Sequence, residues 1–131
     1  MLDASAAISW FFADERDEES LGMASVVAEH GAIVPPIFRL EVQNALITAA
    51  RRRRIKAADV AAHLRSFDDL ELHVDDFALK SSFVNGLELA QQFQLSAYDA
   101  SYLEVAVRMS VPLMTRDADL KRCLLYTSDA A

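Results

Sequence analysis

The chain has 131 residues and a formal net charge of −7; 53% of its residues are hydrophobic and 25% are charged. This composition predicts one globular domain rather than a disordered chain, and the negative charge argues against a general polyanion-binding protein. It does not exclude nucleic acid, because carboxylates that hold cations invert their local field. No apolar run approaches the roughly 20 residues that cross a bilayer, and the N-terminus does not resemble a signal peptide. The single cysteine, Cys123, cannot form an internal disulfide, so we expect a cytoplasmic protein that does not contact membranes.

The first part of the chain alternates short apolar runs with longer amphipathic segments. Residues 1–3 resemble the end of a strand, and residues 4–13 and 17–30 have the apolar spacing of helices. The stretch "GAIVPP" is a short strand that two prolines end. Residues 37–54 then form a long helical pattern that ends in a run of arginines.

The second part of the chain continues this alternation. Helical spacing recurs over residues 58–67, 77–93, 97–109 and 117–124, and short strands are predicted at 70–74 ("LELHV") and 111–115 ("VPLMT"). Strands separated by helices predict an α/β fold whose sheet is mainly parallel. In such a sheet, ligands bind outside the carboxyl ends of the strands.

Three aspartates lie where that rule places ligand-binding groups. Asp3 follows the first strand, Asp117 lies just beyond the last strand, and Asp99 opens a helix in "LSAYDASYLEVA". Each of the three could instead cap a helix, and both interpretations stay open. Ser96 is the better N-cap beside Asp99, and Thr115 is a rival cap beside Asp117.

A fourth acid, Glu41, interrupts an apolar helix face in the second turn of the 37–54 pattern. A carboxylate there is costly to bury unpaired, and an ion pair, for example to Arg39, is the alternative explanation. If the four carboxylates converge, protonation or a bound cation must relieve their repulsion. Oxygen ligands without His or Cys select hard cations such as Mg2+ or Mn2+, which enzymes use to hydrolyse phosphodiesters.

The motifs "LDASAAISWFF", "PPIFRLEVQNAL", "LSAYDASYLEVA" and "PLMTRDADL" resemble, in this order and spacing, the PIN-domain family. Within that family the chain resembles the VapC-like ribonuclease toxins of type II toxin–antitoxin systems. The resemblance implies a three-layer α/β/α fold with a small, mainly parallel central sheet flanked by helices. It also implies catalytic and metal-binding residues, Asp3, Glu41, Asp99 and Asp117, and supporting residues, Ser5, Thr115, Asn44 and Asp119.

The same resemblance implies an Mg2+- or Mn2+-dependent endoribonuclease that cleaves RNA by means of a metal-activated water. It implies a homodimer and a cognate antitoxin whose basic residue can enter the acidic pocket. The alternative is a PIN-like module without catalytic activity that binds a partner protein. The intact set of acids favours the enzyme, and a metal titration would separate the two hypotheses.

The bounds of the domain and the roles of three further segments complete the predictions. Residues 1–121 form the single domain, and residues 122–131 form a C-terminal tail that we expect to be non-native or truncated, because "LLYTSDAA" resembles translated sequencing-adapter read-through. The basic run 51–56 either contacts RNA phosphates or forms a solvated helix end. The aromatic residues 10–12 are expected to contribute to the core and to a partner surface.

Overall fold

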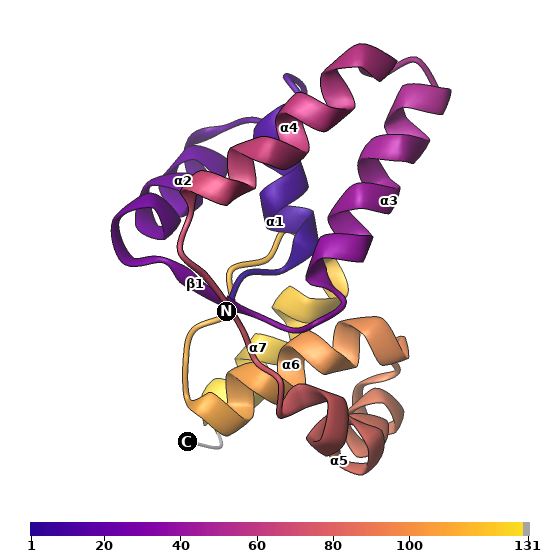
Figure 1. The fold of residues 1–131 in the computed structure, drawn as a ribbon. Helices are drawn as coiled ribbons and strands as arrows, with labels where there is room; N and C mark the ends of the chain where they lie inside the picture. Colours follow the sequence, from indigo (N-terminus) through magenta and orange to yellow (C-terminus); the bar gives the residue numbers. More distant parts are fainter. Residues whose placement is uncertain (130–131) are drawn as a thin grey trace.

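The computed structural model describes the backbone of residues 1–129, and the side chains of these residues except 78–79, 81–82 and 125–129. Figure 1 shows helices α1 to α4 in one part of the molecule and α5 to α7 in the other, with extended segments running between them. The fold is helix-rich with a small parallel sheet, which agrees with the predicted three-layer α/β/α class. None of the described helices is long and apolar enough to cross a membrane.

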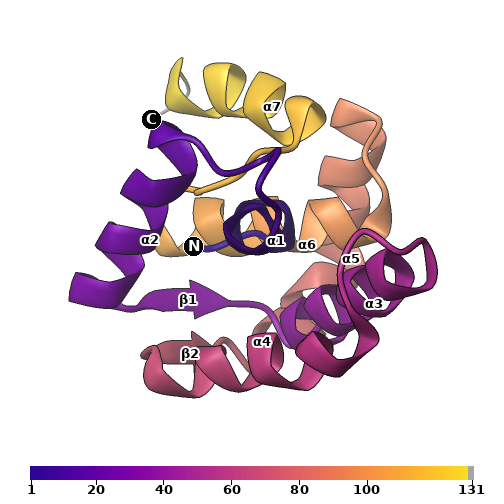
Figure 2. The same ribbon diagram turned by 90° about the horizontal axis from the view of Figure 1, so that it is seen from above.

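The sheet is built from four short segments. Strand β1 (Ala32–Val34) pairs in parallel with β2 (Leu72–Val74), as Figure 2 also shows. The amide of Leu2 donates to the carbonyl oxygen of Ile33 at 3.0 Å, and Leu2 forms a parallel bridge with Met114. The spatial order is therefore β2, β1, the segment at Leu2 and the segment at Met114. The predicted strands meet, but the first and last are reduced to one bridge.

This strand order positions the candidate site. If the four segments are numbered by their place in the chain, their order across the sheet is third, second, first and fourth. The second and third segments are added on one side of the first, and the fourth lies on its other side. The order therefore reverses between the segments at Leu2 and Met114. A crevice forms at such a reversal because the flanking connections leave in opposite directions. Asp3 and Thr115 immediately follow these two segments, so their side chains belong to that crevice.

The helices agree with the predicted segments, and two of them, α1 and α4, continue into 3-10 turns. The N-terminal helices are α1 (Ala4–Ile8), continued by η1 (Ser9–Phe11), α2 (Glu18–His30) and α3 (Phe38–Arg51). The remaining ones are η2 (Ala57–Asp59), α4 (Val60–Ser66), η3 (Phe67–Asp69), α5 (Ala78–Phe93), α6 (Ala97–Met109) and α7 (Ala118–Asp129).

Side-chain caps fix the starts of α2 and α6, among other helices. The Asp17 carboxylate accepts from the amide of Ser20 at 2.9 Å at the start of α2. The Ser96 hydroxyl accepts from the amide of Asp99 at 3.1 Å at the start of α6, which confirms Ser96 as the N-cap. The carboxylate of Asp99 is therefore not the cap of its own helix.

The core lies where the helices cover the extended segments. The predicted face of α3 is buried through Val42, Leu46 and Ala49, because these residues recur at helical spacing on one side. Helix α6 contributes a second buried face that includes Tyr102 and Val105. Burial of both faces fixes the orientation of the acids that the same two helices carry.

Helical spacing predicts that Leu21 in residues 17–30 and Phe83 in residues 77–93 lie on buried helix faces, and both predictions were wrong. In α2, Leu21 is 52% exposed, while Ser20 is buried because its hydroxyl pairs with that of Ser9 at 2.8 Å. A matched hydroxyl pair can enter the core without leaving an unsatisfied polar group, which periodicity alone does not reveal. In α5, Phe83 is 82% exposed, so an apolar face of this helix points to solvent.

We predict that Leu46→Ala lowers the free energy of unfolding by about 3 kcal/mol, because it opens a cavity in a fully buried site. Leu40→Ala is the matched control on the same helix; Leu40 is 66% exposed, and its loss should cost less than about 0.5 kcal/mol. Urea unfolding followed by circular dichroism measures both values. Equal losses in the two variants would contradict the placement of the core.

Candidate metal centre

Asp3 is the most deeply buried of the four acids, at 3% exposure. Its Oδ2 atom accepts hydrogen bonds from the Ser5 hydroxyl at 2.5 Å and the Thr115 hydroxyl at 2.6 Å. Its side chain makes no capping bond to α1. Burial raises the pKa of Asp3, the two hydroxyls oppose this shift, and the charge of Asp117 adds to it.

The two hydroxyls also connect the chain ends around Asp3. Ser5 Oγ accepts from the amide of Arg116 at 2.9 Å, and Thr115 Oγ1 accepts from the amide of Asp117 at 3.0 Å. The two hydroxyl oxygens lie 3.2 Å apart. Ser5 and Thr115 therefore orient the Asp3 carboxylate and, at the same time, bring the segment that carries Asp117 beside it.

Asp99 lies in the first turn of α6 and is partly exposed. Its pKa is raised from 3.8 to about 6, first by partial burial and then by the negative charges of Asp117 and Asp3. Asp99 lines one cavity with Asp3 and Asp117, although the three residues are far apart in the sequence. The structure thus brings Asp99 to the same place as Asp3 and Asp117.

Asp117 both caps a helix and lines the acidic cavity. Its Oδ1 atom accepts from the amides of Asp119 at 2.8 Å and Leu120 at 3.1 Å, so it caps the start of α7. The capping interpretation is therefore confirmed for this residue. Capping occupies one oxygen and holds the carboxylate in place while the side chain still lines the acidic cavity.

Glu41 lies in the first turn of α3 rather than the second, because the helix begins at Phe38. Burial raises the pKa of Glu41, and the charges of Asp3 and Asp99 add to this shift, whereas the nearby Tyr102 hydroxyl opposes it. The hydroxyl thus lies close to the carboxylate. Nevertheless, Glu41 Oε1 and the Tyr102 hydroxyl are both buried without a hydrogen bond of acceptable geometry.

The alternative explanation for Glu41, an ion pair, is not found within the part of the chain that the structure describes. Neither Arg39 nor any other described cation lies within ion-pair distance of its carboxylate. A partly buried carboxylate without a partner is costly. Glu41 therefore has the character of a group kept for binding rather than for stability.

All four acids line one cavity of about 270 Å3. Its walls come from α1, α3, α6 and the segment before α7, and the polar residues among them are Asp3, Ser5, Glu41, Asn44, Asp99 and Asp117. Asp119 is not part of this wall. It is exposed, but its charge still contributes to the raised pKa of Asp99.

The donor set fits a hard divalent cation in chemistry, because it consists of carboxylate, hydroxyl and amide oxygens. Burial and mutual repulsion together raise the pKa values of Asp3, Glu41 and Asp99, and a cation would offset both effects. Among the described side chains, no three His, Cys, Asp or Glu residues already stand at the mutual distances of a bound ion. The acids line the cavity without converging on one point, and ion binding therefore requires their side chains to move toward its centre.

A second cavity, of about 490 Å3, adjoins the acidic one and shares Ser5 and Asp117 with it. Its wall includes Arg52, Arg54 and Arg116. The sequence indicated the arginine run but not that Arg116 would join it, since that contact depends on how the chain ends meet. The two cavities form one surface on which acidic and basic groups lie side by side.

The arginines of the second cavity differ in their pairing. Arg54 contacts the carboxylates of Asp14 and Glu15 at 3.2 and 3.0 Å and covers the ring of Phe12. Arg116 is held by two other carboxylates of the same acidic segment. Within the described residues, Arg52 has no ion pair. Arg52 is therefore the cation of this wall that is available to a ligand.

Comparison with known proteins agrees with this architecture. The family model described as "PIN domain" matches residues 1–123, which is nearly the whole chain. The protein therefore belongs to the PIN domain family, whose members are generally nucleases, and this supports a hydrolase that acts on nucleic acid. No curated protein matches the chain.

We predict that Asp99→Asn stabilises the metal-free protein at pH 7.5 by about 1 kcal/mol, after allowance for solvent screening of this partly exposed group. The pKa of Asp99 is about 6 in the folded protein and 3.8 ordinarily, so the folded state binds the proton more tightly. The wild-type protein should therefore lose stability as the pH rises from about 4 to about 6.

Thermal unfolding in EDTA at pH 4 to 8 measures this effect. Asp59→Asn, which removes an exposed carboxylate outside the cavity, is the control and should leave the pH profile unchanged. A melting temperature of Asp99→Asn at or below that of the wild type at pH 7.5 would show that the carboxylates do not repel one another as described.

Proposed function

We propose that the protein is an Mg2+- or Mn2+-dependent endoribonuclease and the toxin component of a toxin–antitoxin pair. The observation that carries this proposal is that four acids from distant parts of the sequence line one cavity at the edge of the sheet. Membership of a family of nucleases supports the same conclusion. The reaction is hydrolysis of an RNA phosphodiester bond.

All four acids would bind the cation, but different residues hold their side chains in place. Asp3, Asp99 and Asp117 would hold the cation, with Glu41 as a further ligand. When bound, a divalent cation activates water and stabilises negative charge on the leaving oxygen. Ser5 and Thr115 would fix the orientation of Asp3 through their hydrogen bonds to Oδ2.

Two residues at the margin have lesser roles in this proposal. Asn44 lines the cavity one turn after Glu41 and offers an amide to a substrate oxygen or to water. Asp119 lies outside the wall and would act only through its charge. Neither is needed to hold the cation.

The arginine-lined cavity supplies a place for the RNA backbone. An RNA strand whose scissile phosphate lies at the acids would place a neighbouring phosphate close to this wall, because the cavities share Ser5 and Asp117. Arg52 is the free cation there, and a guanidinium can bind two phosphate oxygens at once. The protein's net charge of −7 makes this local arrangement necessary for RNA binding.

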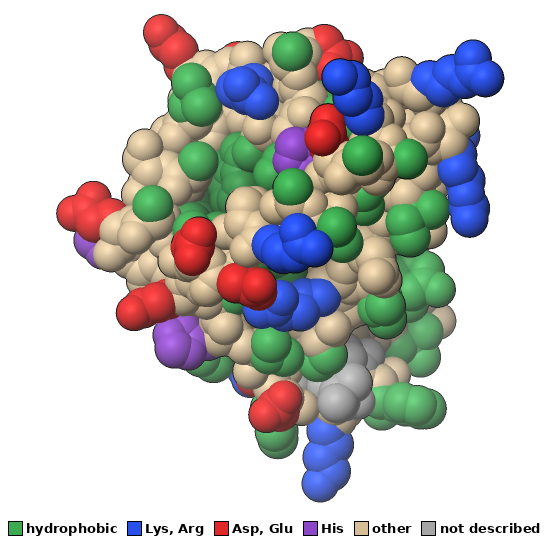
Figure 3. Space-filling model, turned by 45° about the horizontal axis from the view of Figure 1, so that its top comes forward, with side chains coloured by type: hydrophobic (Ala, Val, Ile, Leu, Met, Phe, Trp, Pro, Cys, Tyr) green, Lys and Arg blue, Asp and Glu red, His purple; other side chains and the backbone are tan. Residues whose placement is uncertain are grey.

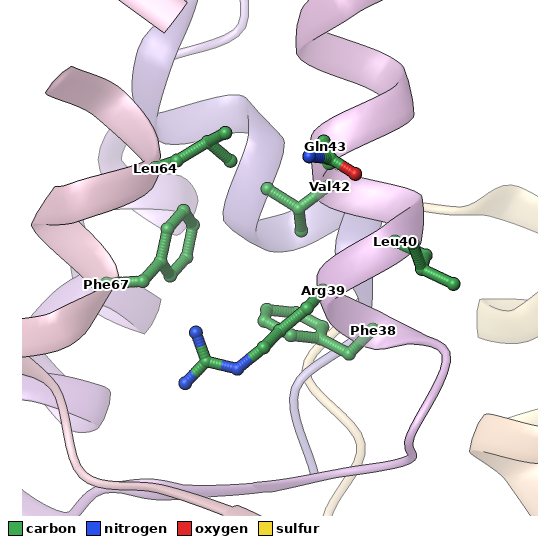
Figure 4. A pocket seen from close by; sticks show the side chains of 7 residues that line it. All are labelled: Phe38, Arg39, Leu40, Val42, Gln43, Leu64 and Phe67. Carbon is green, nitrogen blue, oxygen red and sulfur yellow. The ribbon is translucent and has the colours of Figure 1, made fainter. Parts of the chain in front are cut away.

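Partner binding has its own support. A groove of about 210 Å3 separates α3 from α4 and the 3-10 turn that follows it; it is lined mainly by apolar side chains, which Figure 4 shows around Phe38, Val42, Leu64 and Phe67. Trp10 stacks on the ring of Phe67, and Phe11 meets the same ring edge-on. We propose that an antitoxin segment docks here, which would give the early aromatic residues their expected part in a partner surface.

Self-association is supported by the exposed apolar side of α5, where Phe83, Val84 and Leu87 are 82%, 60% and 52% exposed. Exposed apolar residues gathered on one helix favour an interface, and we propose a homodimer. The face drawn in Figure 3 differs from this apolar side of α5: its Lys, Arg, Asp and Glu side chains are interspersed and do not form one patch of a single sign.

The α3–α4 groove also supports the second candidate function, a non-catalytic module that binds a partner protein. This alternative requires no cation. Titration of the purified protein with Mn2+ separates the two proposals, since binding that Asp99→Asn abolishes supports the nuclease, and the absence of binding supports the module.

We predict that Asp3→Ala, Asp99→Asn and Asp117→Asn each reduce metal-dependent RNA cleavage by at least about 100-fold, because each removes a ligand charge from the cavity. Cleavage of a labelled RNA at saturating Mn2+ measures the loss, with Asp59→Asn as the control that should retain full activity. Unchanged cleavage by Asp99→Asn protein would refute the proposed function.

We predict that Arg52→Ala weakens RNA binding and lowers the salt dependence of the affinity by about one phosphate contact. Fluorescence anisotropy with a short single-stranded RNA measures both, in an Asp99→Asn background that keeps the RNA intact. Arg51→Ala is the matched control, since Arg51 is exposed in the last turn of α3 and lines neither cavity. Identical salt slopes for the two variants would contradict a specific role for Arg52.

A further inference from the structure

Two buried oxygens in the described part of the chain lack a hydrogen bond, and they lie beside each other. They are Glu41 Oε1 and the hydroxyl of Tyr102. Buried polar groups are nearly always paired, so an adjacent pair of unsatisfied oxygens requires an explanation. Glu41 lines the acidic cavity and Tyr102 lies beside it, so that explanation concerns the candidate site itself.

Tyr102 is wholly buried and comes from the same helix as Asp99, one turn further on. Packing alone does not account for its hydroxyl, because Phe would fill the same space without an unpaired polar group. A tyrosine hydroxyl carries its proton at neutral pH. Tyr102 is therefore a hydrogen-bond donor held against a carboxylate that has a free acceptor.

We propose that Tyr102 is a positioning residue of the candidate metal centre, whose hydroxyl donates to Glu41 Oε1 and so leaves Oε2 to face the cavity. This inference rests on the proposed function, because it assigns Glu41 the role of a cation ligand. Ligand carboxylates in metal sites are commonly held in this way by a second hydrogen-bonding group.

Tyr102→Phe tests the proposal, because it removes the hydroxyl and keeps the ring. The dissociation constant for Mn2+ alone, measured by isothermal titration calorimetry, should rise by about tenfold, the usual loss for one hydrogen bond to a charged group. The melting temperature in EDTA should stay equal or rise, because an unpaired hydroxyl has been removed. Tyr98→Phe, at a 59% exposed position one turn earlier in α6, is the matched control and should change neither value.

The outcomes separate this inference from the proposed function. Equal Mn2+ affinity of the wild type and Tyr102→Phe overturns the positioning role while the nuclease proposal stands. A weaker affinity accompanied by a lower melting temperature in EDTA assigns Tyr102 a structural role and also overturns the inference. If the wild-type protein does not bind Mn2+, the proposed function fails, and the positioning role fails with it.

Discussion

Asp3 is buried at the carboxyl edge of the sheet, and the other carboxylates around the same cavity oppose its charge. Two hydroxyls, from Ser5 and Thr115, hold it there although they are 110 positions apart in the chain. The hydrogen bonds of this cluster orient an acid, join the two ends of the domain and bring Asp117 to the site. The fold thus keeps an arrangement of charges that lowers its own stability, and a divalent cation is the ligand that would relieve it.

Different helices and segments contribute the different functional residues around the cavity. Helix α6 contributes Asp99 and Tyr102 from one face, and α3 contributes Glu41 from its first turn. The buried sides of these two helices fix where their polar residues point. Beyond the acids, Arg52 faces a neighbouring cavity, where an RNA phosphate would meet a cation instead of further negative charge.

Much of this could be predicted from the sequence, because it depends on local patterns. Helix positions followed from apolar spacing, and the meeting of Asp3 with Asp117 followed from the rule that parallel strands end at one edge of a sheet. The Ser96 cap could also be predicted, since the preference of serine for the N-cap position depends only on neighbouring residues. The four motifs, taken together, also indicated the family that the comparison later matched.

Other features depend on contacts that no local pattern encodes. The buried Ser9–Ser20 pair reverses the expected face of α2, and the pairing of Arg116 with an acidic segment depends on how the chain ends meet. The unpaired hydroxyl of Tyr102 could not be foreseen, because a tyrosine at helical spacing ordinarily indicates only core packing. In each case the missing information is which other segment of the chain lies next to the residue in the folded protein.

Crystals of the wild-type protein soaked in Mn2+, with diffraction recorded at the manganese edge, test the central claim most directly. The account predicts an anomalous peak inside the acidic cavity, with oxygens of Asp3, Asp99 and Asp117 as its nearest protein atoms. A cavity without such a peak at saturating Mn2+, or a peak bound elsewhere, would show that these carboxylates do not gather around a divalent ion.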